Sequence, residues 1–113
     1  VEDLLITTEA NWMLLLGGCE GVRVHRLRQI GHGHGTDGID IVGSRDVTIT
    51  DCCLHNGDDN IAIKAIDFSA NLSHPGSPGE NYTAPVERVR VSGCMFFNNC
   101  GGSAMEIGYE TRT

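Results

Sequence analysis

The chain has 113 residues, which is enough for about one domain, and its 15 glycines favour tight turns over long helices. A net charge of −7 with only 8 lysine and arginine residues argues against a nucleic-acid partner, because phosphate binding needs a clustered basic surface. No apolar run approaches the roughly 20 residues that cross a bilayer, so no membrane partner is expected.

Short apolar segments of one type recur along the chain and are predicted to be strands. In Ile39-Asp40-Ile41 and Ile61-Ala62-Ile63 the residues alternate with the period of two that is typical of a strand with one buried face. In chain order the four segments are MLLLG (13–17), GIDIVG (38–43), NIAIKA (60–65) and AMEIG (104–108).

A second, longer segment alternates with these strands and occurs three times, as GVRVHRLRQIG (21–31), DVTITDCCLHNG (46–57) and RVRVSGCMFFNN (88–99). Self-similarity at 22 to 25 residues (59 minus 37, and 47 minus 22), without helical periodicity, predicts a β-solenoid. A single turn of such a coil cannot cover its own apolar face and must stack on its neighbours. The expected fold is therefore all-β, a parallel β-helix of about three to four rungs, where a rung is one turn of the coil.

One insertion interrupts the repeat at about residues 66–84, IDFSANLSHPGSPGENYTA. Its proline, glycine, serine and asparagine content indicates a loop. In repeat proteins such an excursion leaves the stack undisturbed and often shapes the binding face. Residues 1–113 are therefore expected to form a single β-helix unit with one loop insertion.

Several side chains are expected to stack between the second and third long segments, which lie 42 residues apart (89 minus 47). Asn56 and Asn98 predict an internal amide ladder at a bend, because stacked amides satisfy polar groups that burial would leave unpaired. The five cysteines form no CxxC pair, which disfavours a zinc ribbon, and they are expected either to be packed thiols or to include one disulfide. The predicted core stacks are Cys52 on Cys94 and Leu54 on Phe96.

Aspartates precede two of the short strands at the same offset. Asp37 comes two residues before Ile39, and Asp59, with Asp58 beside it, comes two residues before Ile61. Equivalent positions in successive rungs are about 4.8 Å apart, so we expect these carboxylates to lie one above the other. Two like charges at about 5 Å cost roughly 3 kcal/mol at an effective dielectric of about 20, which a purely structural coil has little reason to tolerate.

A cluster of this kind suits acid–base chemistry at one bond. One carboxyl of such a group tends to have a raised pKa while the others stay ionised, which divides the acid and base roles. Cleavage of a glycosidic bond uses this arrangement, with one acid protonating the leaving oxygen and another carboxylate activating water or attacking. Calcium binding and turn capping are the alternatives that spacing leaves open.

The segments TDGIDI (36–41), VTITDC (47–52) and GDDNIAIK (57–64) resemble the signature segments of glycoside hydrolase family 28, the polygalacturonase family. The resemblance implies a right-handed parallel β-helix and inverting hydrolysis of α-glycosidic bonds in a pectin-like polysaccharide, with no cofactor and no metal. It also implies an extracellular or periplasmic location, although no basic-then-apolar leader precedes Val1. It further suggests that the remainder of the β-helix is missing at both ends.

The same resemblance implies roles for the three aspartates. Asp58 matches the general acid, whereas Asp37 and Asp59 match the residues that hold and activate the water. Two positions depart from the family pattern. Gly35 stands in place of the asparagine of Asn-Thr-Asp, and Ser103 stands in place of a histidine near the acids, which implies a different substrate or a weakened site.

Four further residues are candidates for substrate binding: Glu106, Lys64, Ser103 and His34. Glu106 takes an outward slot on a strand that starts at the acidic edge, and its alternative is a surface charge paired with Lys64. His34 precedes Asp37 by three residues, and its alternative is a solvated turn histidine. Two other functions stay open, a related β-helix hydrolase acting on a neutral α-glucan and a noncatalytic β-helix that binds carbohydrate or calcium.

Overall fold

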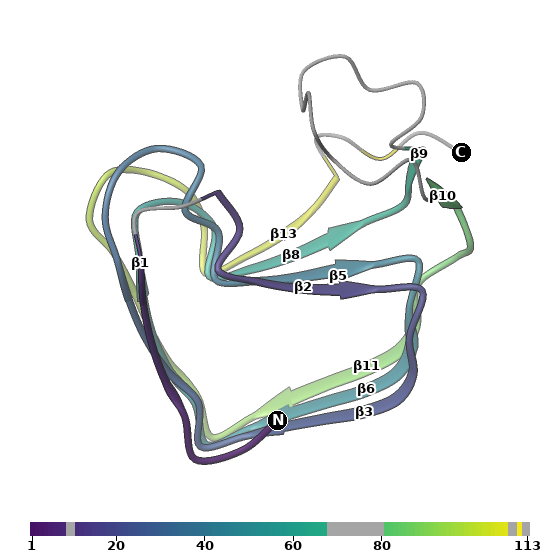
Figure 1. Cartoon of the computed structure of the whole chain (residues 1–113), viewed down its shortest axis with the longest axis horizontal. Helices are drawn as coiled ribbons and strands as arrows, with labels where there is room; N and C mark the ends of the chain where they lie inside the picture. Colours follow the sequence, from purple (N-terminus) through teal and green to yellow (C-terminus); the bar gives the residue numbers. More distant parts are fainter. Residues whose placement is uncertain (9–10, 68–80, 109–110, 112–113) are drawn as a thin grey trace.

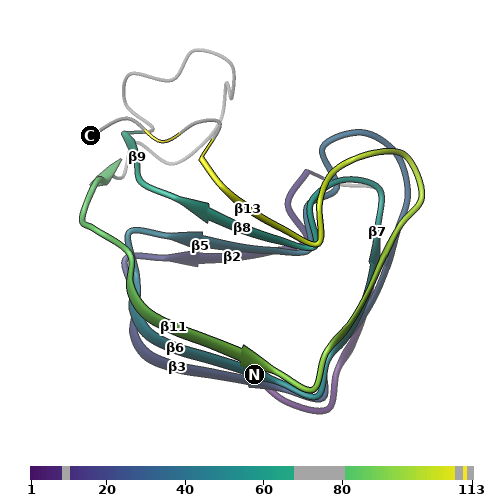
Figure 2. The ribbon, with the colours of Figure 1, turned by 180° about the vertical axis from the view of Figure 1, so that it is seen from behind.

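The computed structural model describes residues 1–8, 11–67, 81–108 and 111, and it shows a chain that winds repeatedly around one core (Figure 1). The described residues form strands and turns, and none of them forms a helix that is long and apolar enough to span a membrane. Seen from either side, the strands superpose in three sheets that enclose the core (Figures 1 and 2).

Each sheet stacks equivalent strands from successive rungs, four in sheets 1 and 2 and three in sheet 3 among the described residues. Sheet 1 contains β1 (Leu5–Thr8), β4 (Arg28–Gly31), β7 (Cys53–Asn56) and β12 (Met95–Asn98). Sheet 2 contains β2 (Leu14–Gly17), β5 (Ile39–Val42), β8 (Ile61–Lys64) and β13 (Met105–Ile107). Sheet 3 contains β3 (Glu20–His25), β6 (Arg45–Thr50) and β11 (Glu87–Ser92). All pairings within the three sheets are parallel, which confirms the predicted β-helix.

The register of the strands follows the sequence repeat. Val47 pairs with Val22 on one side and with Val89 on the other, as the alignment of the long segments predicts. In sheet 2 the equivalent column is Leu14, Ile39, Ile61 and Met105. The repeat in the sequence therefore predicts which residues lie one above the other in space.

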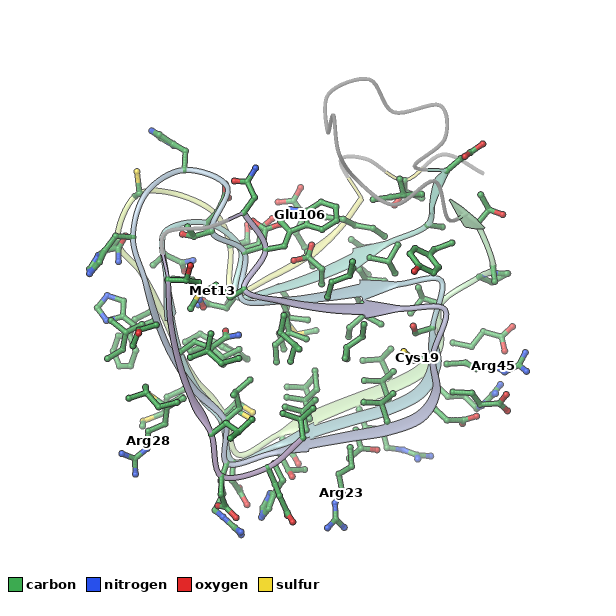
Figure 3. All side chains as sticks on the ribbon, viewed as in Figure 1. Met13, Cys19, Arg23, Arg28, Arg45 and Glu106 are labelled. Atoms are coloured by element: carbon green, nitrogen blue, oxygen red, sulfur yellow. The ribbon has the colours of Figure 1, made fainter. Side chains whose placement is uncertain are left out.

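The apolar side chains of the three sheets meet inside the coil. Ile39, Ile41, Ile49 and Leu54 are fully buried there, and each such burial contributes about 1.5–3 kcal/mol. The polar faces of the strands point outward, as Arg23, Arg28 and Arg45 do in Figure 3. Ile107, at the last rung, is 80% exposed, so the core is complete only where a rung has a neighbour on both sides.

The predicted insertion leaves the coil after β8. Its described ends form a short antiparallel pair of β9 (Ile66–Asp67) with β10 (Asn81–Tyr82), and its middle lies outside the described residues. Val42 and Ile66 are buried in a second apolar cluster, separate from the core, against which Trp12 and Tyr82 pack. This cluster covers part of the outward face of sheet 2.

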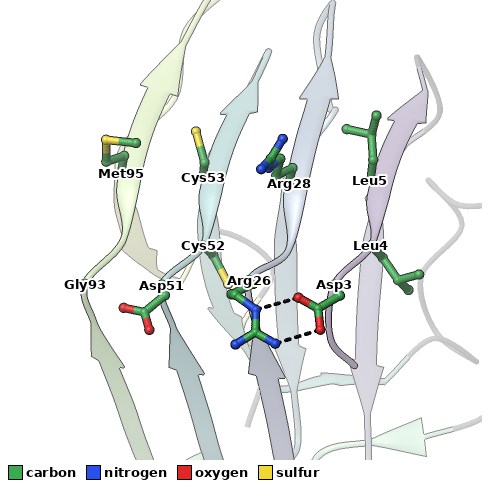
Figure 4. A pocket seen from close by; sticks show the side chains of 10 residues that line it. All are labelled: Asp3, Leu4, Leu5, Arg26, Arg28, Asp51, Cys52, Cys53, Gly93 and Met95. Carbon is green, nitrogen blue, oxygen red and sulfur yellow. Dashed lines mark hydrogen bonds and ion pairs between the residues drawn. The ribbon is translucent and has the colours of Figure 1, made fainter.

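The corner between sheets 3 and 1 uses one residue per rung in the left-handed conformation. These residues are Asp3, Arg26, Asp51 and Gly93, with φ between 50° and 66°. A groove lies over this corner (Figure 4), where the guanidinium of Arg26 donates to both carboxylate oxygens of Asp3. None of the three predicted catalytic aspartates lines the groove.

The five cysteines are free thiols, so the disulfide alternative is wrong. Cys52 is buried and stacks on Cys94, whose Sγ lies 3.4 Å from the backbone nitrogen of Cys52, as the register predicts. Cys100 is exposed, which contradicts the expectation of a packed thiol at that position. Its position on a loop between sheets, away from the stacked strands, accounts for the difference.

Candidate active site

The predicted catalytic residues lie on the loops that lead from sheet 1 to sheet 2. These loops bulge from one corner of the coil in Figures 1 and 2 and comprise residues 32–38, 57–60 and 99–104. The backbone ladder of sheet 2 continues into them, since the N–H of Gly38 donates to the carbonyl of Asp59 at 2.8 Å. In the same way, the N–H of Asn60 donates to the carbonyl of Ser103 at 2.9 Å. Asp37, Asp59 and Ser103 therefore occupy equivalent places in three successive rungs.

This stacking brings the three aspartates together. One carboxylate oxygen of each of Asp37, Asp58 and Asp59 lies within 4.8 Å of the other two. Asp37 is 5% exposed and Asp59 is 8% exposed, whereas Asp58 is half-buried. The predicted contact between acids 22 residues apart (59 minus 37) is confirmed as a matter of geometry. Oxygens at this spacing can share a proton or hold a water molecule, and they are also the hard ligands that calcium uses.

Backbone donors orient two of the carboxylates. The Oδ2 of Asp58 accepts from the N–H of Gly35 at 2.9 Å, and its Oδ1 accepts from the N–H of Asp59 at 3.1 Å. The Oδ1 of Asp59 accepts from the N–H of Ser103 at 2.6 Å. At position 103, where the resemblance implies a histidine, the contact with the acids is thus made by the main chain.

Glycine is required where the loops touch. Gly102 has a φ of +81°, and a Cβ there would overlap the peptide that joins Asp58 to Asp59. Gly35 has a φ of +74°, and a Cβ there would meet the Oδ1 of Asn11 at 2.5 Å. An asparagine from the preceding rung therefore occupies the space beside position 35, where the resemblance implies an asparagine side chain.

The three carboxyls differ in electrostatic environment. Burial raises the pKa of Asp59, and the negative charges of Glu106, Asp37 and Asp58 add to the rise, while the hydrogen bond from Ser103 opposes it. Asp59 is therefore a carboxyl with a raised pKa, although the resemblance gives the role of the acid to Asp58. Glu106 projects from the outward side of sheet 2 (Figure 3) and is a fourth carboxylate that acts on the cluster.

Asp37 is held by a side chain. The Nζ of Lys64 lies 2.8 Å from the Oδ2 of Asp37 and 2.8 Å from the Oδ1 of Asp40. It also lies 4.1 Å from the centroid of the Trp12 ring. Sequence reasoning places Lys64 among the substrate-binding candidates or opposite Glu106; the structure instead buries it, 4% exposed, against two aspartates.

Asp40 is the residue of this region that sequence reasoning missed. The alternation in GIDIVG places it correctly on the outward face of its strand, but it is fully buried there. Burial raises its pKa to about 8, against the opposing effect of Lys64 and with a further contribution from Asp37. No local signal marks this burial, because the covering groups come from Trp12 in one neighbouring rung and Lys64 in another.

His34 lies on the rim of the site. It is exposed, and the Sγ of Cys100 lies 3.6 Å from both of its ring nitrogens. These residues belong to the loops on either side of Asp58, and Gly35, the neighbour of His34, donates to that carboxylate. The structure thus places His34 close to the cluster in the chain and in contact with a thiol of the adjacent loop.

A buried amide network supports the loops from below. Asn56 is fully buried, and its Oδ1 accepts from the Nδ2 of Asn60 at 2.7 Å. Its Nδ2 donates to Gln29, whose own Nε2 donates to the carbonyl of Gly38 at 2.8 Å. The register of Asn56 with Asn98 is as predicted, but Asn98 donates to the carbonyl of Asp58 instead of forming an amide ladder. The network fixes the backbone beside Asp37, because Gly38 follows it directly.

Comparison with known proteins identifies similar sequences. The model of the family described as glycosyl hydrolases family 28 matches residues 1–99. The chain is 29% identical to a polygalacturonase of Juniperus ashei and 35% identical to a polygalacturonase of Chamaecyparis obtusa, in each case over 90% of the chain. It is 36% identical to a probable polygalacturonase of Arabidopsis thaliana over 63% of the chain.

The chain is much shorter than these relatives. The matched region covers 23% of the Juniperus protein, 22% of the Chamaecyparis protein and 18% of the Arabidopsis protein. No solved structure gives a significant match to the chain.

Proposed function

The chain belongs to glycosyl hydrolases family 28, and from this premise we propose that it carries the catalytic aspartates of a polygalacturonase-type hydrolase. The proposed reaction is inverting hydrolysis of α-glycosidic bonds in a pectin-like polysaccharide, outside the cytoplasm. The observation that carries the proposal is the cluster of Asp37, Asp58 and Asp59, whose nearest oxygens lie within 4.8 Å of one another although they come from two rungs.

In the proposed mechanism Asp58 is the general acid. It is the most exposed of the three carboxyls, so it is the one that a polysaccharide lying across the cluster reaches most directly. Its proton passes to the glycosidic oxygen as the bond to the anomeric carbon breaks. The hydrogen bonds from Gly35 and Asp59 fix the carboxyl for this transfer.

Asp37 and Asp59 are the proposed bases. A water molecule held between them transfers one proton to one of the two carboxylates as its oxygen attacks the anomeric carbon from the face opposite to the leaving group. Inverting enzymes separate acid and base carboxyls by about 6.5–9.5 Å, and this cluster, measured between its nearest oxygens, is tighter. Ser103 is compatible with activity in this scheme, because its contribution is the backbone N–H that holds Asp59.

The stereochemistry of the product tests this assignment of the bases. Proton NMR of the first sugar released should show the inverted anomer. Retention would mean that one carboxylate attacks the sugar directly, and it would remove the water-holding role from Asp37 and Asp59.

The test of the acid uses Asp58→Asn in the intact protein. We expect turnover to fall by about 10²–10⁴-fold, the contribution typical of general acid catalysis. Reducing ends released from polygalacturonate and from a neutral α-glucan give the rate. Asp51→Asn is the matched control, since Asp51 is an exposed aspartate at the corner between sheets 3 and 1. Unchanged turnover in Asp58→Asn would remove Asp58 from the mechanism.

A second candidate function is hydrolysis of a neutral α-glucan. Glu106 adds a carboxylate beside Asp59, and Lys64, the single lysine of the chain, is already paired with Asp37 and Asp40. Both features disfavour a substrate carboxylate near Asp59. Turnover of the α-glucan without turnover of polygalacturonate would assign this function, and calcium or sugar binding without any hydrolysis would assign the noncatalytic alternative.

A further inference from the structure

Lys64 lies in a buried group of charges next to the proposed catalytic cluster. The side chains of Lys64, Asp37 and Asp40 are 4%, 6% and 0% exposed. The ammonium lies 2.8 Å from an oxygen of each aspartate. Ion pairs withdrawn from water to this degree are weakly screened, so they fix geometry far more firmly than surface pairs do.

The three rungs around this group each supply one part of it. Lys64 ends β8, Asp40 lies in β5, and Trp12 precedes β2. The cross-strand neighbour of Asp40 in β8 is Ala62, whose small side chain leaves the outward face of β5 open for the lysine to reach back across it. The ring of Trp12 lies 4.1 Å from the ammonium. The arrangement therefore depends on the stacking of three rungs.

The charges of the group balance only when one aspartate is neutral. Lys64 supplies one positive charge against two carboxyls, and Asp40 is the more deeply buried of the two. The Oδ2 of Asp40 accepts no hydrogen bond from the described residues, a situation that protonation of this carboxyl relieves. The hydrogen bond that Lys64 donates to Oδ2 of Asp37, at 2.8 Å, is then its remaining ion pair in the group.

A sugar cannot contact the ammonium of Lys64 directly in this arrangement. The side chain is 4% exposed, and its Nζ is enclosed by Asp37, Asp40 and Trp12. Any effect of Lys64 on the reaction must therefore pass through Asp37, whose Oδ2 accepts a hydrogen bond from the ammonium and whose carboxylate belongs to the cluster.

We propose that Lys64 and Asp40 are positioning residues that fix the orientation and charge of Asp37, with Trp12 covering the pair. This inference rests on the proposed function, because it assigns Asp37 a part in holding the attacking water. It also replaces the expectation that Lys64 binds substrate.

The kinetic test compares Lys64→Met, Lys64→Arg and Asp40→Asn in the intact protein, on whichever polysaccharide the unmodified enzyme hydrolyses. Misplacing a catalytic group by about 1 Å costs about 100-fold, so we expect Lys64→Met to lower kcat by about that factor while KM changes by less than about 3-fold. Lys64→Arg keeps the charge in a different shape and should restore part of kcat. Arg45→Met is the control, because it removes an exposed cross-rung ion pair with Glu20.

A raised KM with unchanged kcat in Lys64→Met would overturn the proposal, since it would show direct contact with substrate. Unchanged kcat and KM would also overturn it. Thermal unfolding of each variant is measured first, and if Lys64→Met does not fold, the same comparison is made with Lys64→Arg and Asp40→Asn. Equal kcat values in those two variants and the unmodified enzyme would then overturn the proposal.

The second readout does not depend on activity. In ¹⁵N-labelled protein the ammonium of Lys64, identified by its loss in Lys64→Arg, should exchange its protons slowly because it is buried and paired. Asp37→Asn should accelerate that exchange by about 10-fold or more, the effect of losing about 1.4 kcal/mol of protection, whereas Asp40→Asn leaves a neutral side chain beside the ammonium and should change it by less than about 3-fold. If the ammonium exchanges slowly but the protein hydrolyses no polysaccharide, the proposed function is refuted and the buried charge group of Lys64, Asp37 and Asp40 is supported. If the ammonium exchanges fast in a protein that is an active hydrolase, the buried charge group is refuted and the proposed function stands.

Discussion

At the scale of single residues, the three aspartates of the cluster are chemically identical and are distinguished only by what surrounds them. Asp58 is half-buried and held by two backbone N–H groups. Asp59 is buried beside other carboxylates, and its pKa is raised by that burial first and by Glu106 next. Asp37 forms an ion pair with the ammonium of Lys64. Environments that differ in this way allow one residue type to divide acid and base work.

The raised pKa of Asp40 predicts how stability depends on pH. Below an ordinary aspartate pKa of 3.8 the folded and unfolded chains both hold the proton, and between 3.8 and about 8 only the folded chain does. The folded state then binds more protons, so this carboxyl contributes stability at low pH that is lost as pH rises towards about 8. The largest possible slope for one proton is about 1.4 kcal/mol per pH unit.

Urea unfolding of wild type and Asp40→Asn between pH 4 and pH 9 measures this contribution. The two charged groups that act on Asp40 are Lys64 and Asp37, and its cross-strand neighbours Leu15 and Ala62 do not titrate. We expect wild type to lose stability relative to Asp40→Asn as pH rises through this range. A difference that stays constant with pH would show that Asp40 is ionised in the folded protein throughout.

At the scale of the elements, the loops between sheets 1 and 2 are positioned by close backbone contact. Gly102, on the third loop, lies directly against the peptide that joins Asp58 to Asp59, at a φ of +81°. Gly33, on the first loop, has a similar φ of +89° but no atom within 4 Å of the place where a Cβ would be. These two glycines share a positive φ and differ in the contact that a Cβ would make.

The pair Gly102→Ala and Gly33→Ala therefore separates loop packing from backbone strain. Both substitutions should cost about 1–2 kcal/mol of stability, because an L-residue is strained in this conformation. Gly102→Ala should in addition displace the two aspartates and lower kcat by about 10- to 100-fold. Polysaccharide hydrolysis and urea unfolding, measured on both variants, check this. Equal kcat values for the two variants would mean that the position of the third loop does not control the acids.

At the scale of the whole molecule, stability and the site come from the same stacking. The fully buried residues lie in the central rungs, and in the last rung Met105 and Ile107 are 44% and 80% exposed. A site assembled from three successive loops exists only while the rungs that carry them stay in register. Loss of the core in one rung should therefore weaken the whole array, as is typical of repeat architectures.

Ile41→Ala tests this dependence at a central position. Ile41 is fully buried in β5, and truncation of such a side chain costs about 2–5 kcal/mol. Ile30→Ala is the matched control, because Ile30 lies in β4 on the outward face and is 46% exposed, and its loss should cost less than about 1 kcal/mol. Urea denaturation gives both values. Similar losses for the two variants would contradict the observed placement of the core.

The sequence alone was sufficient to predict the parallel coil, the register of Val22, Val47 and Val89, and the contact of Asp37 with Asp58 and Asp59. These features follow from the repeat, because a constant offset along the chain becomes a vertical neighbour in the stack. Two stacks, Cys52 on Cys94 and Leu54 on Phe96, follow in the same way.

Only the tertiary structure revealed the burial of Asp40, its close contact with Lys64, and the amide partners of Asn56. These contacts run diagonally between rungs, and they depend on side-chain length and on which residue covers which face. A period in the sequence specifies which backbone positions are stacked, but it carries no information about how far a lysine reaches across a strand or which carboxyl is withdrawn from water.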